Sequence, residues 1–262
     1  TDLLSSWTTE IGQQKILSSH AGKGLWNLAT ELITRDWRLF REVRRFNPDI
    51  LVARVGPSAA HVGFLLRKPV IVFEDTDDAR LQQMISFPFV THVCTAVHYK
   101  RDWGQKHLRY NSFDELAYLH PNRFQPDELI VKNAGLTPGE YIVVRFVKWK
   151  ASHDINQYGV NQDLQVDLIR QLTEKRQVVI SSEDSLPDEL ESMKTPVSPE
   201  DFHHLLAFAD LVIGESSTVI TEGAMLGVPG ILINTMNWSS IDRLVEEYGL
   251  VFQTQDTREA LN

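Results

Sequence analysis

The stretch that decides the fold is "ADLVIGESSTVITEGAMLGVPGILIN" at residues 209–234, in which a short apolar run leads through small hydroxyl residues into a helix. The apolar residues 211–213 predict a buried strand that ends at Gly214, followed by a helix over 219–226 and a second strand over 230–233. Because ligands of parallel α/β sheets bind at the carboxyl ends of strands, the turn between strand and helix is the expected place for a binding site.

Two interpretations of the polar residues in this turn stay open. In the first, Ser216, Ser217 and Thr218 hold a phosphate at the N-terminus of the helix, and Glu222, one turn further, accepts hydrogen bonds from ribose hydroxyls. In the second, Ser216 or Ser217 is only the N-cap of the helix and Glu222 is a solvated helix residue. The stretch by itself favours neither interpretation.

The rest of the chain repeats the alternation of apolar strands and helices. Strands are expected at 49–55, 69–73, 92–97, 141–147 and 177–181, and helices at 24–46, 58–66, 77–85, 160–175 and 200–209. Segment 48–74 also echoes segment 209–235, because both read Asp, apolar strand, Gly, small hydroxyl residues, helix, Pro, strand. The pattern predicts an α/β protein with two Rossmann-like domains, residues 1–130 and 131–262, whose parallel sheets are covered on both faces.

The composition limits the classes of partner. A net charge of −9 argues against nucleic acid, and the single cysteine, Cys94, excludes an internal disulfide. No apolar run approaches the ~20 residues of a membrane span, so the cytoplasm is the expected location, with peripheral membrane association left open. The chain starts without Met and stops at the predicted start of a helix, so the natural protein is expected to be longer, with a first strand before residue 1.

An acidic cluster follows the strand "PVIVF" and includes Glu74, Asp75 and Asp77. Like charges crowded in a partly dry cleft raise one another's pKa, which would suit one of them to accept a proton from a sugar hydroxyl. These three residues are the candidate catalytic carboxylates. The alternative is that Asp77 caps the next helix and the other carboxylates are solvated.

Several ordered motifs resemble known families. "ESSTVITEGAMLGVP" resembles the nucleotide-sugar signature of the GT-B superfamily, which includes UDP-N-acetylglucosamine 2-epimerase and the MurG-like glycosyltransferases. "FEDTDDA", "ELAYLHPNRFQPD", "VVRFVKWKASHD" and "EEYGL" resemble the uncharacterised family named domain of unknown function 354. The resemblance implies a GT-B-like fold, in which two Rossmann-like domains face a central cleft.

The same resemblance implies roles for individual residues. Ser216, Ser217 and Thr218 would hold the diphosphate of a nucleotide sugar, Glu222 would bind the ribose, and Arg145 would supply positive charge to the departing diphosphate. Lys148 is a weaker candidate for that charge. Because hydroxyls, backbone N–H groups and Arg145 would neutralise the diphosphate, neither a metal nor a cofactor is expected.

Two departures from the epimerase pattern bear on the reaction. Gly56, Pro57 and Ser58 stand where the epimerases have a Gly-Asp-Thr motif, and residues 145–148 stand where they have a Thr-Ala-His-Arg motif. Glu74, in contrast, matches a second catalytic carboxylate of the epimerases. The expected function is therefore a metal-independent glycosyltransferase that uses a UDP-sugar donor and a sugar or glycolipid acceptor in polysaccharide or glycoconjugate synthesis. The alternatives are a nucleotide-sugar epimerase or hydrolase, and a non-catalytic nucleotide-sugar-binding protein of polysaccharide assembly.

Other polar and aromatic residues carry weaker signals. His203 is expected to cap or pack a helix. The family pattern alone implies that Tyr118 lines an interdomain crevice. Trp26 and Trp37 are expected in the core. His153 and Asp154 lack the spaced further ligands that a metal site needs.

Overall fold

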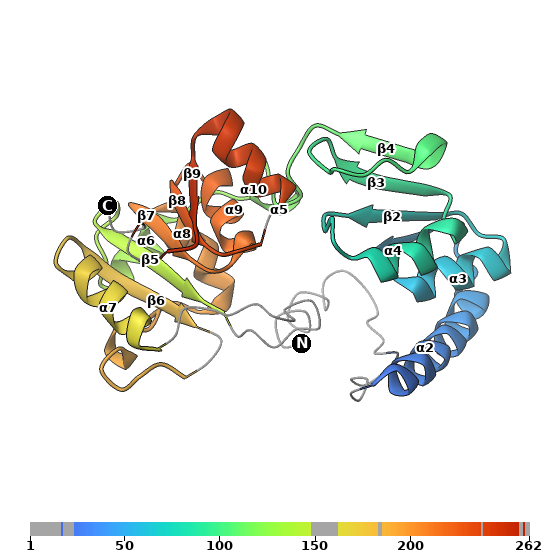
Figure 1. The fold of residues 1–262 in the computed structure, drawn as a ribbon, viewed down its shortest axis with the longest axis horizontal. Coiled ribbons are helices and arrows are strands. Elements are labelled where there is room, and N and C mark those ends of the chain that lie inside the picture. Colours follow the sequence, from blue (N-terminus) through green and yellow to red (C-terminus); the bar gives the residue numbers. More distant parts are fainter. Residues whose placement is uncertain are drawn as a thin grey trace. The chain divides into compact units, whose positions relative to one another are not determined.

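The computed structural model describes residues 17, 24–147, 162–182, 185–236, 238–256 and 259. The chain divides into two compact units, Thr1–Ser112 and Phe113–Asn262, and Figure 1 labels the elements within each. Each unit contains one parallel β-sheet with helices packed on it. The prediction of an α/β protein with parallel sheets is confirmed.

The first unit contains a sheet with strand order β1-β2-β3-β4. Its elements are α2 (Leu25–Phe46), β1 (Leu51–Arg54), α3 (Pro57–Leu66), β2 (Val70–Glu74), α4 (Arg80–Ser86), η1 (Phe87–Phe89), β3 (His92–Ala96), η2 (Gly104–Lys106) and β4 (His107–Tyr110).

Helix α3 packs on strands β1 and β2 and buries the inward residues of the sheet, among them Val70, Val72 and Val93. Val52, Phe73 and Leu108 are exposed instead. Because side chains alternate between the two faces of a strand, these residues point away from the core built around Val70 and Val72. The expectation that this sheet is covered on both faces is therefore wrong for the described residues.

The second unit contains a sheet with strand order β6-β5-β7-β8-β9, all parallel. Its elements are α5 (Leu116–Leu119), α6 (Glu128–Asn133), β5 (Tyr141–Phe146), α7 (Gln162–Thr173), β6 (Gln177–Ser182), η3 (Glu191–Met193), η4 (Pro199–Asp201), α8 (Phe202–Ala207), β7 (Leu211–Gly214), α9 (Ser217–Met225), β8 (Gly230–Ile233), α10 (Ser239–Arg243), the π-helical turn η5 (Leu244–Tyr248) and β9 (Val251–Thr254).

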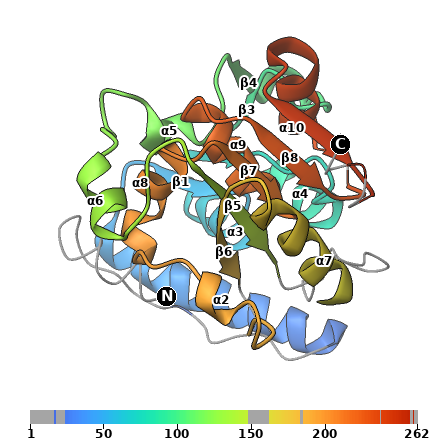
Figure 2. The same ribbon diagram turned by 90° about the vertical axis from the view of Figure 1, so that its left-hand side faces the viewer.

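Both faces of this second sheet are buried, and strand β5 shows how. Tyr141 and Val143 lie in one core with residues of α8 and α9, whereas Ile142 and Val144 lie in another core with residues of α7. A strand buried on both faces has no polar alternation, which is why its sequence reads as a continuous apolar run. Figure 2 shows β5, β6 and β7 with α7 and α9 around them.

The two echoing segments have the same local structure. In the first unit β1, α3 and β2 form a strand–helix–strand unit with parallel pairing, and in the second unit β7, α9 and β8 do the same. The helix starts directly after Gly56 in one segment and after Ser216 in the other. Sequence similarity within the chain therefore corresponds to a repeated supersecondary unit.

The sequence missed strands β4 and β9 and helices α5, α6 and α10. In β4, "HLRY", two exposed residues lie between two partly buried ones, and in β9 only the first and last residues are buried. Neither segment has the continuous apolar run that indicates a buried strand.

The predicted division after residue 130 falls within helix α6, whose Val131 lies in the core of the second unit. The contacts between Cα atoms place the division between Ser112 and Phe113. The domain limits 1–130 and 131–262 stay a prediction.

The aromatic residues of α2 do not lie in the core, contrary to expectation. Trp26 is 86% exposed and Trp37 is 62% exposed. Helix α2 packs mainly against α3 and buries Val43, while Trp37 stacks on its helix neighbour Phe40 with ring centroids 6.0 Å apart.

Candidate functional site

The second sheet has a topological switch point between β5 and β7. Strand β6 lies on one side of β5 and β7 lies on the other, so the β5–β6 connection and the β6–β7 connection run in opposite directions across the sheet. Ligands of open parallel sheets bind in the crevice outside the carboxyl ends of the strands at such a point. Residues 209–234 include β7 and the start of α9, so the hydroxyl-rich turn between these two elements lies at the switch point.

Close contact of the two strand backbones at the switch point requires a glycine. Gly214 pairs with Arg145, and a Cβ atom added to Gly214 would collide with the Arg145 backbone. The N–H of the next residue, Glu215, donates to the Arg145 carbonyl oxygen at 3.1 Å. The absence of a side chain at Gly214 thus lets the carboxyl ends of β5 and β7 lie together.

Glu215 has a structural role at this edge. Its carboxylate is buried and accepts a hydrogen bond from the Val147 N–H, with Oε2 3.2 Å from the nitrogen. Its carbonyl oxygen accepts a hydrogen bond of 3.0 Å from the Asn234 side chain at the end of β8. Glu215 therefore ties the segment after β5 to the end of β7, which argues against the use of this carboxylate as a cation ligand.

Ser216 is the N-cap of α9. Its Oγ accepts a hydrogen bond from the Val219 N–H at 3.4 Å, and its backbone is extended, as N-cap residues are. Ser217 begins the helix, and Thr218 is exposed. Capping by Ser216 is compatible with anion binding at this turn, because a capping serine still leaves other N–H groups of the first turn available to an anion.

Arg145 lies on the face of the sheet that carries α9. Side chains alternate along β5, so Arg145 shares a face with Tyr141 and Val143, whose core includes Val219 and Ile220 of α9. Its Nη1 donates a hydrogen bond of 2.8 Å to the hydroxyl of Ser181 on β6. The guanidinium is therefore held on this face, one residue before the carboxyl end of β5.

Glu222 is buried rather than solvated, with 8% of its surface exposed. The Tyr118 hydroxyl donates to Glu222 Oε1 at 2.9 Å, and His203 Nε2 lies 3.1 Å from the same oxygen. Glu222 and Thr218 are four residues apart and so lie on one face of α9. Tyr118 comes from α5 and His203 from α8, so three helices contribute to this cluster.

Glu74 is the most perturbed carboxylate of the first unit. It ends β2, only 2% of its surface is exposed, and burial raises its pKa to about 7. Backbone hydrogen bonds from Thr76 (2.9 Å) and Asp75 (3.1 Å) and a 3.4 Å contact with the Gln83 amide lower the pKa, and the negative charge of Asp75 raises it. Desolvation is therefore the largest cause of the raised pKa, and the like charge of Asp75, which the sequence analysis expected to act, adds to it.

The other two carboxylates of the cluster have different environments. Asp75 is partly exposed and forms an ion pair with Arg54 at the end of β1. Asp77 is buried and accepts a hydrogen bond of 2.9 Å from the Lys100 N–H. Asp77 is not the cap of the following helix α4, whose N-cap position is Ala79. Glu74 and Asp77 are thus buried, whereas Asp75 is partly exposed.

A tyrosine lies close to this cluster. Burial raises the pKa of Tyr99 to about 12, and the charges of Glu74 and Asp77 add to the shift. Tyr99 is therefore a neutral phenol at physiological pH. Among the described residues its hydroxyl has no hydrogen-bond partner.

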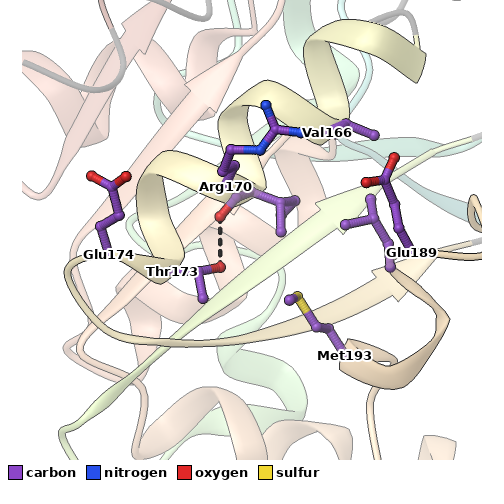
Figure 3. A pocket seen from close by; sticks show the side chains of 8 residues that line it. Val166, Arg170, Thr173, Glu174, Glu189 and Met193 are labelled. Carbon is purple, nitrogen blue, oxygen red and sulfur yellow. Dashed lines mark hydrogen bonds between the residues drawn. The ribbon is translucent and has the colours of Figure 1, made fainter.

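A separate hollow of about 270 Å³ lies on the opposite face of the second sheet, beside α7 (Figure 3). Its walls are formed by four apolar residues, Val166, Ile169, Leu190 and Met193, and four polar or charged residues, Arg170, Thr173, Glu174 and Glu189. The Thr173 hydroxyl in this wall donates to the carbonyl of Ile169 at 2.7 Å, within its own helix. None of the sequence-predicted site residues lines this hollow.

Two kinds of feature are absent from the described ranges. Within these ranges no three His, Cys, Asp or Glu side chains gather as the ligands of one metal ion. No described helix combines the length and apolar character needed to cross a bilayer. Lys148, His153 and Asp154 lie outside the described residues.

The structure thus brings Arg145 and the start of α9 to one edge of the second sheet, and it places Glu74, Asp75 and Asp77 in the first unit. The roles assigned to these residues stay predictions. Sequence reasoning gave little weight to Tyr118 and His203, which both contact Glu222. The motif "ELAYLHPNRFQPD" contained one of them, but no spacing rule connects it to a helix that starts at residue 217.

Comparisons with known proteins agree with this architecture. A family model described as "Protein of unknown function (DUF354)" matches residues 15–262. An uncharacterized protein of Methanocaldococcus jannaschii, MJ0665, is 20% identical over 233 residues, which span 84% of this chain and 67% of that protein.

Two solved structures extend the comparison. UDP-N-acetylglucosamine 2-epimerase from Rickettsia bellii matches with a TM-score of 0.68 and 15% identity over 99% of this chain and 76% of that chain. The glycosyltransferase SsfS6 from Streptomyces sp. SF2575, complexed with thymidine diphosphate, matches with a TM-score of 0.53 and 13% identity over 89% of this chain and 65% of that chain. At such identities the likeness establishes the fold, which is GT-B-like.

Proposed function

From the premise that this chain belongs to the DUF354 family, we propose that it binds a nucleotide sugar, and that it is a metal-independent glycosyltransferase with a UDP-sugar donor. Ser216, Ser217 and Thr218 would hold the diphosphate, Arg145 would neutralise its charge, and Glu222 would bind the ribose. The acceptor would be a hydroxyl of a sugar or glycolipid in polysaccharide or glycoconjugate synthesis.

One observation carries the proposal: the N-terminus of α9 lies at the switch point, with Arg145 on the same face of the sheet. A helix N-terminus favours an anion by its N–H groups and its dipole, and Thr218 and Glu222 extend one face of the helix from this end. A diphosphate at the first turn and a ribose one turn along fit this order of groups. The epimerase with a similar fold is named for a UDP-sugar, and the glycosyltransferase with a similar fold is complexed with a nucleoside diphosphate. Both support a nucleotide sugar as the ligand class.

In the proposed transfer, Glu74 acts as the general base. Its carboxylate takes the proton of the acceptor hydroxyl, the acceptor oxygen bonds to the anomeric carbon, and the bond from that carbon to the β-phosphate oxygen breaks. The released UDP carries away the bonding electron pair, and Arg145 with the N–H groups of α9 stabilises its charge. A pKa of about 7 suits a group that must accept a proton near neutral pH.

A nucleotide-sugar epimerase is the second candidate, and the similarity to the Rickettsia epimerase favours it. Against it, Pro57 occupies the acidic position of the epimerase Gly-Asp-Thr motif and starts α3. Product analysis separates the candidates. Release of UDP that depends on an added acceptor supports transfer, whereas a 2-epimer formed without acceptor supports epimerisation. Tight binding with no turnover supports a non-catalytic nucleotide-sugar-binding protein.

Replacing Glu222 with Ala is expected to weaken binding of UDP about 10- to 100-fold, because charge-assisted hydrogen bonds of roughly 1.5–3 kcal/mol are lost. Isothermal titration calorimetry with UDP measures the effect. Glu174→Ala, on the far face of the sheet, is the control and should leave the affinity unchanged. Equal affinities of wild type and Glu222→Ala would remove Glu222 from the ribose site.

Nucleotide binding and any turnover are expected to survive excess EDTA. Hydroxyls, N–H groups and Arg145 are proposed to neutralise the diphosphate, a task that Mg²⁺ or Mn²⁺ performs through several oxygen ligands in other sites. The measurement is UDP affinity and UDP release before and after chelation. Activity that EDTA abolishes and Mg²⁺ or Mn²⁺ restores would contradict the assignment of the phosphate site.

A further inference from the structure

We propose that Tyr118 and His203 are positioning residues that orient Glu222, and that this arrangement makes the site selective for ribonucleotide sugars over 2′-deoxyribonucleotide sugars. The inference rests on the proposed function, since it requires Glu222 to face the sugar of the nucleotide. The inference adds Tyr118 and His203 to the proposed site, and it predicts that 2′-deoxyribonucleotide sugars bind poorly.

Both donors bind the same carboxylate oxygen. The Tyr118 hydroxyl is 2.9 Å and the His203 Nε2 is 3.1 Å from Oε1 of Glu222. A carboxylate can only accept, so Nε2 of His203 carries a hydrogen in this contact. These two charge-assisted hydrogen bonds come from different helices, and together they restrict rotation of the Glu222 carboxylate about its last side-chain torsion.

The donors are themselves held by aromatic packing. The ring centroids of Tyr118 and His203 lie 5.5 Å apart, and the ring centroid of Phe124 lies 6.0 Å from that of His203. Tyr118 is 104 residues from Glu222 in the chain, and His203 is 19 residues away. The carboxylate is thus fixed by two separate helices in addition to its own.

This geometry leaves one oxygen for the ligand. Each carboxylate oxygen offers about two lone-pair sites, and Oε1 uses both of its sites for Tyr118 and His203. Within the described part of the chain, Oε2 accepts no hydrogen bond. It keeps two sites, which matches the two hydroxyls of a ribose 2′,3′-diol.

A 2′-deoxyribose would leave one of these sites unfilled. Because Glu222 is buried, water replaces a missing hydroxyl poorly, and sites built to bind a hydroxyl reject analogues that lack it. If Tyr118 or His203 no longer holds Oε1, the carboxylate can turn and present either oxygen, so the penalty for the deoxy ligand falls. The positioning residues therefore control the preference between the two ligands as well as the affinity.

The test compares the affinities of UDP and 2′-deoxy-UDP by calorimetry. The wild-type chain is expected to bind UDP at least about 10-fold more tightly than 2′-deoxy-UDP. In Tyr118→Phe and His203→Leu the preference should fall below about threefold, whereas His203→Gln, which can place an amide N–H near the position of Nε2, should keep most of it. Tyr248→Phe, an exposed tyrosine of the same unit, is the matched control and should keep the wild-type preference.

A purely structural role would weaken both nucleotides equally and leave their ratio unchanged, so an unchanged ratio in both Tyr118→Phe and His203→Leu overturns the inference. Equal wild-type affinities for the two nucleotides also overturn it while leaving nucleotide binding intact. A wild-type chain that binds neither nucleotide overturns the proposed function and this inference with it. Circular dichroism of each variant identifies a loss of fold. Because Tyr118→Phe and His203→Leu change different helices, the test still stands if one of these variants does not fold.

Discussion

Glu74→Gln is expected to lower turnover of the UDP-sugar that the wild type uses by at least about 10²-fold, with the affinity for UDP changed less than twofold. General base catalysis acts only in the transition state, so the loss belongs to turnover rather than to binding. Gln has nearly the same shape and still accepts the N–H groups of Asp75 and Thr76, but it cannot take a proton. The measurement is steady-state release of UDP together with UDP calorimetry.

The comparison variants are Asp75→Asn and Asp49→Asn. Asp75 is partly exposed and paired with Arg54, so its replacement should have a smaller effect than that of Glu74, and the exposed Asp49 serves as the control outside the cluster. If Glu74→Gln keeps wild-type turnover, the base lies elsewhere and the proposed mechanism is contradicted.

The pKa of Glu74 adds a pH dependence with a defined sign. Turnover should rise as the pH increases through about 7 and then level off, because the carboxylate form is the active base. Stability should change in the opposite direction. A raised pKa means that the folded state holds the proton more tightly, so this contribution is fully present below pH 4.5 and is lost as the pH rises through about 7. Glu74→Gln should therefore be more stable than wild type at pH 8, by an amount on the order of 2–3 kcal/mol, and should lose this advantage at pH 4.5.

Gly214→Ala is expected to destabilise the second unit by about 3 kcal/mol or more and to abolish measurable UDP binding. The added Cβ would collide with the Arg145 backbone, which belongs to the neighbouring central strand and cannot move aside as a side-chain end can. Overpacking costs typically 1–3 kcal/mol, and here the strands that must separate also carry the proposed phosphate site. Urea unfolding and UDP calorimetry measure the two effects.

Gly223→Ala is the graded control. Its Cβ would lie 3.0 Å from a methyl group of Val212, a side-chain contact that a small shift of α9 can relieve. We expect a loss of stability well below that of Gly214→Ala, with UDP binding retained. A Gly214→Ala protein with wild-type stability and affinity would show that the switch point does not need this close approach.

Much of the second sheet was predictable because its central strands are buried on both faces. Apart from Arg145, the residues of β5 and β7 that meet either face are uncharged and mostly apolar, so the sequence itself indicates where these strands lie. Strands β4 and β9 escaped prediction because their four-residue segments contain polar residues and no continuous apolar run, whereas the edge strand β6 contains such a run and was predicted. The N-cap role of Ser216 was also local and was named correctly as one alternative.

The environments of the carboxylates depended on contacts between distant segments. Glu74, Asp75 and Asp77 are nearly adjacent in the sequence, yet one is desolvated, one is paired with Arg54, and one holds the Lys100 backbone. Composition and spacing contain no measure of burial, and burial is what raises the pKa of Glu74. Similarly, Glu222 acquired its partners from residues 104 and 19 positions away.

By itself the sequence determined the α/β class, the parallel strands, and the position of a strand-to-helix turn rich in hydroxyls, because hydrophobic periodicity and turn residues act over a few neighbours along the chain. Only the tertiary structure decided that this turn lies at the switch point beside Arg145, and that Tyr118 and His203 hold Glu222. The reason is physical: strand order and side-chain contacts arise when separate hydrophobic faces pack together, and packing joins residues that no local pattern connects.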